Sequence, residues 1–281
     1  MDNKLLSIII NYFNPNEHPR IEATLLLALE SISSYTHHSY EVIISDASTN
    51  VSARLHEICL RKHWTYLHMP QASFPEGFNK GASKATGEYL VLMASDIFVC
   101  ADWDKTLLCE LKRTEAWMAA PYLTASDYRA QTQFWGLRMK TFSPSAMTLN
   151  LIMISAQHFE QLGMLDPNLG HFNDIDLLFR VRESGGEAII AYCGQVSHIS
   201  GATMSVATSI DYRADKDIFL NKHPCLKSRN ARMDYDSHHK RFMRNPLLRT
   251  YFKVCASIPL PRAASFLASV GTRIEPVLNK A

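Results

Sequence analysis

The N-terminal part of the chain alternates short apolar runs with longer stretches in which apolar residues recur every three or four positions. Residues 5–10 form a β-branched apolar run followed by polar residues, which predicts a buried strand. In residues 19–34 the apolar positions have helical spacing, which predicts a helix with one buried face. The same alternation predicts, in order, a strand at 40–44, a helix at 51–62, a strand at 64–68, a short helix at 79–85 and a strand at 89–93.

Strands that alternate with helices predict an α/β fold with a Rossmann-like, mostly parallel sheet flanked by helices. Ligands of such sheets bind at the carboxyl ends of the strands. Asn11, Asp46 and Asp96 each follow a predicted strand. We therefore expect these three residues at one edge of the sheet.

The second part of the chain has a less regular pattern. A helix is expected from about residue 104, and 122–148 has no clear period and is expected to be loop and short strand. The elements expected after it are a strand at 149–154, a helix at 158–162, an amphipathic helix at 173–183 and a strand at 187–192.

Beyond about residue 211 the chain becomes rich in Lys, Arg and His, with Pro breaks near 246 and at 259–261. This pattern predicts an appended helical tail. We expect one domain over 1–210, with halves of about 1–103 and 104–210, and a C-terminal helical extension over 211–281.

Composition narrows the function without deciding it. The chain has 281 residues, of which 47% are hydrophobic and 20% charged, as expected for a globular protein with a large core. A net charge of +2 argues against nucleic acid as the main partner. Six cysteines without a CxxC pair suggest neither a zinc knuckle nor a disulfide scaffold, and fit reduced thiols in a cytoplasm.

No apolar run approaches the roughly 20 residues that a membrane-spanning helix needs, and the N-terminal run is too short for a signal peptide. Basic and aromatic residues between Arg241 and Lys280 would suit a helix lying on an anionic membrane surface. The alternative is a helix packed on the main domain. A membrane contact, if made, is expected to be peripheral.

Several polar residues are candidates for chemistry. Asp46 and Asp96 could simply cap turns, but two acids at one sheet edge can also bind a nucleotide and a hard divalent cation. Asp174 and Asp176 lie in the first turn of a predicted helix, where a carboxylate is stabilised and stays ionised, as a general base must be. His198 is either a structural histidine or a third metal ligand.

An ordered set of segments resembles the family 2 glycosyltransferases of the GT-A fold, including its rhamnosyltransferase-like bacterial members. The resemblance covers about residues 5 to 205, and the order of the segments makes it more specific than any one of them. In the first half the segments are 11–14 (NYFN), 44–49 (ISDAST), 77–82 (GFNKGA), 85–90 (ATGEYL) and Ser95-Asp96. In the second half they are 159–166 (FEQLGMLD) and 173–180 (NDIDLLFR).

Carried over by position, the resemblance implies a role for each candidate. Asp46 would contact the base and Asn11 would lie near the nucleotide. Asp96 would be the last acid of the Asp-x-Asp motif and bind Mn²⁺ or Mg²⁺, with His198 completing the metal site. Asp174 would be the catalytic base, with Asn173 and Asp176 on the acceptor side. The residues implied to bind the donor are Asn11, Asp46, Asn79, Ser95 and Asp96.

Two positions depart from the family pattern. Ala94 replaces the first acid of Asp-x-Asp, which removes a possible ribose or metal contact. Asn173 replaces the glutamate of the family's Glu-Asp motif, which leaves the base itself in place.

The resemblance also implies the reaction. An inverting hexosyl- or deoxyhexosyltransferase would move a sugar from a nucleotide-diphosphate sugar to a hydroxyl of a glycan or lipid-linked acceptor. By analogy with the family the context would be surface polysaccharide synthesis, in the cytoplasm at the inner face of the cell membrane.

Two other functions are compatible with parts of this pattern. A noncatalytic nucleotide-sugar-binding or scaffold protein could keep the fold with a degenerate site, and Ala94 favours it. A nucleotidyltransferase would need a Gly-rich basic phosphate loop after the first strand, and residues 11–16 offer none.

Overall fold

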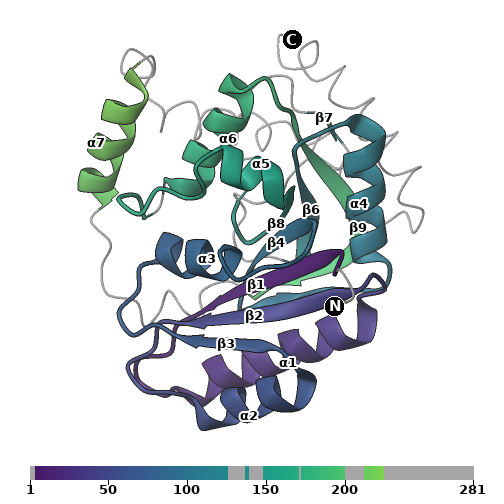
Figure 1. Ribbon diagram of the computed structural model, residues 1–281, viewed down its shortest axis with the longest axis vertical. Coiled ribbons are helices and arrows are strands. Elements are labelled where there is room, and N and C mark those ends of the chain that lie inside the picture. Colours follow the sequence, from purple (N-terminus) through teal and green to yellow (C-terminus); the bar gives the residue numbers. More distant parts are fainter. Residues whose placement is uncertain (1–3, 126–136, 139–147, 171, 200–211, 225–281) are drawn as a thin grey trace.

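A computed structural model describes residues 4–125, 137–138, 148–170, 172–199 and 212–224 (Figure 1). Its centre is a nine-stranded sheet in the order β3-β2-β1-β4-β8-β6-β9-β5, with β7 paired to β9. The strands are β1 Leu6–Tyr12, β2 Tyr40–Asp46, β3 Thr65–His68, β4 Tyr89–Ala94, β5 Ile97–Phe98, β6 Met118–Ala125, β7 Leu137–Arg138, β8 Leu151–Ser155 and β9 Ala188–His198. The helices are α1 Pro19–Tyr35, α2 Ala53–Lys62, α3 Phe74–Ala82, α4 Trp103–Thr114, α5 Ala156–Gln161, α6 Asn173–Glu183 and α7 Tyr212–Lys222.

The sheet is parallel in the N-terminal half and mixed beyond it. β1 pairs in parallel with both β2 and β4, and β3 pairs in parallel with β2. β8 enters antiparallel to β4, and β6 is antiparallel to β8 but parallel to β9. The predicted α/β fold with helices flanking a Rossmann-like sheet is confirmed, and the antiparallel strand β8 is the junction between the two halves.

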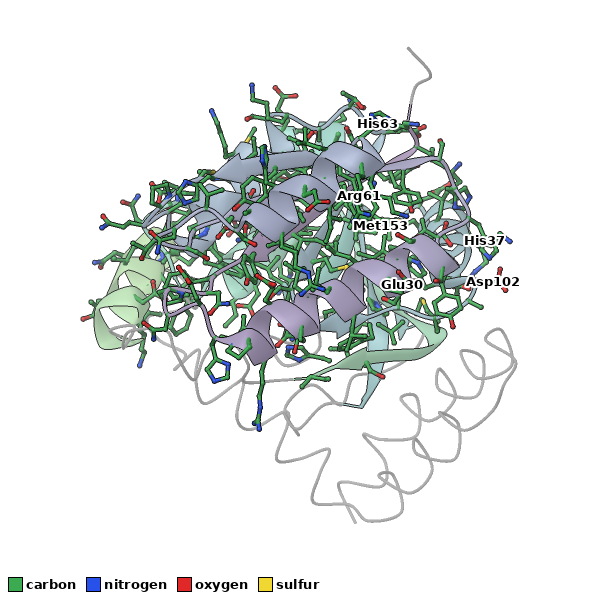
Figure 2. All side chains as sticks on the ribbon, turned by 90° about the horizontal axis from the view of Figure 1, so that it is seen from below. Glu30, His37, Arg61, His63, Asp102 and Met153 are labelled. Carbon is green, nitrogen blue, oxygen red and sulfur yellow. The ribbon has the colours of Figure 1, made fainter. Side chains whose placement is uncertain are left out.

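Helices cover both faces of the sheet because buried strand residues point alternately to either side. In β1, Ile9 packs in one core cluster with residues of α3, α5 and α6. Its neighbours Ile8 and Ile10 pack in the other cluster with residues of α1, α2 and α4. Figure 2 looks onto this second face, where His37 after α1 approaches Asp102 before α4 with a nitrogen–oxygen distance of 3.3 Å.

The start of α3 differs from the sequence prediction, because the helix begins at Phe74 and not at residue 79. The backbone N–H and the hydroxyl of Ser73 each donate to the Glu76 carboxylate at 2.7 Å. This is a capping box, and Pro75 fits the first turn of a helix. The segment that was expected to be loop is therefore the first turn of α3.

Two elements follow α6 in the described part of the chain, β9 and α7. β9 continues to His198, beyond the strand expected at 187–192. α7 confirms a helix after residue 211, whereas the expected membrane-binding segment 241–280 lies outside the described residues. No helix in the described ranges is long and apolar enough to cross a membrane.

Candidate functional site

The carboxyl ends of β1, β2 and β4 meet at one edge of the sheet, as the sequence predicted. The strand register places Asn11 beside Ala94 and Tyr12 beside Asp46. Ser95 and Asp96 follow β4 directly, and both are buried. The donor-side candidates of three strands are therefore neighbours along this edge.

Asp46 is completely buried and its carboxylate is bound within the protein. One oxygen accepts a hydrogen bond from the backbone N–H of Ser48 at 2.8 Å, and the other accepts one from the Tyr66 hydroxyl. Burial and the adjacent Asp46 carboxylate raise the pKa of Tyr66 well above its ordinary value, so this hydroxyl keeps its proton. A nucleotide base can therefore reach Asp46 only if the structure around it rearranges.

Asn11 joins the end of β1 to the start of α3. Its Nδ2 atom donates to the backbone carbonyl of Phe74 at 2.6 Å. Its Oδ1 atom is buried without a hydrogen-bond partner among the described residues. It lies so close to Gly77 that a Cβ atom at that glycine would be 2.3 Å away. Asn11 thus fixes where α3 begins relative to the sheet edge.

Asp96 and His198 are brought together by the short pairing of β5 with β9, which was not predicted. In this antiparallel pair Ile97 lies beside His198. The His198 Nε2 atom is 3.2 Å from Asp96 Oδ1, and each side chain is 8% exposed. The backbone N–H of Ile199 also donates to the Asp96 carbonyl at 3.0 Å. The structure therefore unites the two residues that were implied to hold a metal.

A carboxylate oxygen and an imidazole nitrogen are suitable ligands for Mn²⁺. Within the described ranges no cluster of three or more His, Cys, Asp or Glu residues suits a metal ion. A cation held by Asp96 and His198 would thus need its other ligands from water or from the oxygens of a substrate.

Asp174 lies in the first turn of α6 and keeps part of its surface exposed, although protein surrounds its carboxyl group. Burial raises its pKa to about 7, and the negative charge of Asp215 adds to the rise. The hydrogen bond that its Oδ1 accepts from the Ile175 N–H, at 2.8 Å, acts in the opposite direction. The helix N-terminus was expected to keep the Asp174 carboxylate ionised. Burial, which favours the protonated form, outweighs this stabilisation of the charged form.

A carboxyl group with a pKa near the working pH is suited to take a proton from a hydroxyl. The raised pKa of Asp174 is compatible with such a proton transfer.

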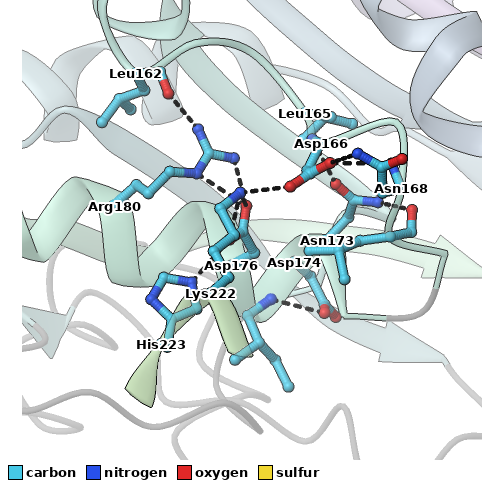
Figure 3. A network of polar contacts seen from close by, with 12 residues as sticks. Leu162, Leu165, Asp166, Asn168, Asn173, Asp174, Asp176, Arg180, Lys222 and His223 are labelled. Atoms are coloured by element: carbon cyan, nitrogen blue, oxygen red, sulfur yellow. Dashed lines mark hydrogen bonds and ion pairs between the residues drawn. The ribbon is translucent and has the colours of Figure 1, made fainter. Parts of the chain in front are cut away.

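Asp176 has a role that the sequence did not indicate. Its carboxylate is completely buried, and three cationic or titratable side chains surround it (Figure 3). The shortest distances are 2.7 Å to Arg180, 2.9 Å to Lys222 and 2.8 Å to His223. These contacts with α6 and with the end of α7 give Asp176 a structural role beside the acceptor-side role implied earlier.

Asn79 and Asn173 both shape the loop at 165–170. The Asn79 amide accepts from the N–H of Leu165 at 2.9 Å and donates to the carbonyl of the same residue at 2.8 Å. The Asn173 Oδ1 atom accepts from the Asp166 N–H at 3.1 Å, and its Nδ2 atom donates to Leu169 (Figure 3). Both amides are engaged with backbone, which gives each a structural role beside the donor-side or acceptor-side role implied earlier.

Four further residues contact the candidate site residues and could not be predicted from the sequence, because their partners are distant in the chain. Tyr66 of β3 donates to Asp46, Asp215 and Lys222 are on α7, and His223 directly follows that helix. The available signal was a helix after residue 211 with apolar residues on one side and a Lys-His pair at its end, which is typical of packing against another element.

The sheet and the polar residues at its carboxyl edge define the GT-A class of glycosyltransferase. Residues 7–164 match the sequence profile of glycosyl transferase family 2, which is more than half of the chain. The chain therefore belongs to glycosyl transferase family 2, and the resemblance stated from its motifs is confirmed.

Solved structures with the same fold include three sugar-nucleotide enzymes. GalNAc-T7 with UDP, GalNAc and Mn²⁺ has a TM-score of 0.55 at 19% identity, covering 92% of this chain and 59% of that one. The mannosyltransferase PcManGT of Pyrobaculum calidifontis, in complex with GDP-Man and Mn²⁺, has a TM-score of 0.57 at 12% identity, with coverages of 99% and 84%. S. aureus TarS 1-349 in complex with UDP-GlcNAc has a TM-score of 0.60 at 13% identity, with coverages of 98% and 91%.

At these identities the similarity establishes the shared fold. The chain spans 59% of the length of the GalNAc-T7 chain that it matches.

Proposed function

We propose that this glycosyltransferase moves a hexosyl or deoxyhexosyl group from a nucleotide-diphosphate sugar to a hydroxyl acceptor by a single displacement with inversion. The observation that carries the proposal is Asp174, a partly exposed residue whose buried carboxyl group has its pKa raised to about 7. It lies at the start of α6, in the half of the chain that follows the donor-side edge.

In this mechanism the Asp174 carboxylate accepts the proton of the acceptor hydroxyl as the oxygen attacks the anomeric carbon. The bond from that carbon to the diphosphate breaks at the same time, and the nucleoside diphosphate leaves with both bonding electrons. No covalent bond between sugar and enzyme is needed, so the configuration inverts.

The donor is assigned to the carboxyl edge formed by Asn11, Asp46, Ser95 and Asp96, and contact of the nucleotide base with the buried Asp46 requires that the structure around Asp46 rearranges. Asp96 and His198 would hold Mn²⁺ or Mg²⁺, whose positive charge stabilises the leaving diphosphate. In support, the GalNAc-T7 and PcManGT structures both contain a nucleotide or nucleotide sugar with Mn²⁺.

We assign the donor half to about residues 1–103 and the acceptor half to about 104–210. The acceptor we propose is a glycan or lipid-linked saccharide in surface polysaccharide synthesis at the inner face of the cell membrane. Deleting the residues after Asn245 should then reduce cosedimentation with anionic liposomes and spare transfer to a soluble acceptor. Equal cosedimentation of both forms would remove the membrane contact from the proposal.

The direct test is the release of nucleoside diphosphate from UDP-GlcNAc, UDP-GalNAc and GDP-mannose, with and without Mn²⁺ and with a panel of saccharide acceptors. Asp174→Asn should lower turnover by at least about 10²-fold and leave donor affinity nearly unchanged. Asp102→Asn is the control, because Asp102 is an exposed carboxylate at 61% exposure. Near wild-type turnover by Asp174→Asn would contradict the assigned base.

A second function, a noncatalytic nucleotide-sugar-binding protein, is favoured by Ala94, which replaces the first acid of the Asp-x-Asp motif. Such a protein would bind the donors above but release no free nucleoside diphosphate with any acceptor. The same assay therefore separates the two functions.

A further inference from the structure

The helix α7 is attached to α6 through an aromatic cluster. Phe219 of α7 is completely buried, and its ring centre lies 5.1 Å from that of Phe172 and 6.0 Å from that of Phe179. Phe172 directly precedes α6, and Phe179 is on it. α7 therefore packs against the helix that carries Asp174.

Ion pairs strengthen the attachment at the C-terminal end of α7, next to the aromatic cluster. Lys222 contacts both Asp166 and Asp176, with nitrogen–oxygen distances of 2.7 Å and 2.9 Å. His223 is 4% exposed and lies 2.8 Å from Asp176 (Figure 3). Because Asp176 is buried among these groups, separating α7 from α6 would leave a buried carboxylate with fewer partners, which is costly.

Asp215, also on α7, binds the segment that leads into α6. Its carboxylate is 5% exposed, and its two oxygens accept from the N–H of Gly170 at 2.7 Å and the N–H of Phe172 at 3.1 Å. Phe172 is the residue at which α6 is capped, and its own side chain makes no capping hydrogen bond. A carboxylate from another helix thus satisfies backbone donors next to the first turn of α6.

The charge of Asp215 also acts on Asp174, because its repulsion adds to the effect of burial in raising the pKa of Asp174. The other charged groups nearby are engaged with one another. Arg180 and His223 pair with Asp176, and Lys222 bridges Asp176 and Asp166. Asp215 is therefore the charge that the structure links most directly to the protonation of Asp174.

We infer that Asp215 is a positioning residue for Asp174, and that α7 is part of the catalytic unit and not an appended tail. Asp215 fixes the backbone before the first turn of α6 and sets the electrostatic surroundings of the base. This inference rests on the proposed role of Asp174. It concerns residues outside the 7–164 segment that matches the family.

The test compares Asp215→Asn with Asp217→Asn in the full-length chain. Asp217 is on the same helix but exposed, so the matched substitution controls for the loss of a charge on α7. The first readout is the carboxyl ¹³C titration of Asp174, assigned from the signal lost in Asp174→Asn. The second is the pH dependence of kcat and the donor KM in the nucleotide-release assay.

Removing the Asp215 charge should shift the titration of Asp174 to lower pH, by less than the shift that burial causes in the opposite direction. It should also lower kcat by about tenfold with donor KM changed less than about twofold, because the loop before the base loses a hydrogen bond. Asp217→Asn should leave both readouts unchanged. Asp215→Glu keeps the charge but moves it, so kcat should fall while the titration stays near that of the wild type.

Wild-type titration of Asp174 and wild-type kcat in a folded Asp215→Asn variant would overturn the inference. If Asp215→Asn fails to fold, an unchanged kcat in Asp215→Glu would overturn it instead. Failure of the proposed function is distinguishable from failure of this inference. If the wild-type protein releases no nucleotide, the Asp174 titration can still be compared between the wild type and Asp215→Asn.

Discussion

The Nε2 atom of His198 lies 3.2 Å from the Oδ1 atom of Asp96, although most of the acceptor half separates these residues in the chain. The contact depends on β5, a two-residue strand that pairs with the end of β9. The residues proposed to hold a metal are therefore brought together by the pairing of β5 with β9, two strands far apart in the chain, and not by a local motif.

Asp96→Ala should lower Mn²⁺-dependent turnover by at least about 10²-fold, because a bound metal supplies several kcal/mol of charge stabilisation. Binding of the nucleoside diphosphate should weaken mainly when Mn²⁺ or Mg²⁺ is present, as measured by titration calorimetry. Asp217→Ala, at an exposed position of α7, serves as the control for removing an acid. Unchanged metal dependence in Asp96→Ala would place the cation elsewhere or make the reaction metal-independent.

Turnover should rise with pH and level off above about pH 7, since the pKa of Asp174 is about 7 and only its carboxylate can accept a proton. Below the pKa, kcat should fall about tenfold for each pH unit. Nucleotide release measured from pH 5 to 9 checks this. A flat profile across pH 7 would be incompatible with Asp174 as the base.

The same pKa predicts an effect on stability with a defined sign. The pKa of Asp174 rises from 3.8 to about 7 on folding, so the folded protein binds this proton more tightly than the unfolded chain. The free energy of unfolding therefore falls as pH rises from about 4 to about 7, and the loss is complete above pH 7. Asp174→Asn should stabilise the protein by roughly 1–3 kcal/mol at pH 8 and change little at pH 4. Denaturant unfolding at the two pH values measures both.

Asp176→Asn should lower stability and have a smaller direct effect on the chemical step. It removes one partner of a buried group of charges that includes Arg180 and Lys222, which typically costs about 3 kcal/mol. Asp217→Asn, on an exposed site of α7, should change stability by less than about 0.5 kcal/mol. Equal stability of the two variants would show that the ion pairs around Asp176 contribute little.

Gly77→Ala should destabilise the protein by about 1–2 kcal/mol, although alanine is normally favoured over glycine in a helix. The new methyl group would lie 2.3 Å from Asn11 Oδ1 and displace a side chain that bonds to Phe74. Nucleoside diphosphate binding should weaken with it. In the double variant with Asn11→Ala, the clash is absent, so the two destabilisations should be less than additive.

Periodicity predicted the parallel half of the fold well, because each β-α unit there carries its own pattern. β1, β2 and β4 begin within a residue of their expected positions, and α1 begins at Pro19 as expected. Their order along the chain was enough to place Asn11, Asp46 and Asp96 at one edge. The family motifs suggested the proposed role of Asp174, which periodicity cannot indicate.

What the sequence could not predict depends on contacts between distant segments. The strand β8 has the apolar pattern that was expected, but nothing in that pattern states that it pairs antiparallel to β4. The burial of Asp46 depends on Tyr66, and the role of Asp176 depends on α7. A carboxylate has the same sequence signature whether it meets a ligand or a neighbouring hydroxyl or cation.

The two hydrogen bonds between the Asn79 amide and Leu165 connect the proposed donor half to the proposed acceptor half. The halves are thus not exchangeable modules. In a chimera that joins residues 1–103 of this chain to the corresponding second half of a relative, Asn79 would lose both hydrogen bonds if the new loop had a different backbone. The bonds are kept only if the new loop places an N–H and a carbonyl at the position of Leu165. Recombination of donor and acceptor specificities in this protein therefore has to preserve that loop's backbone, even where its side chains are free to change.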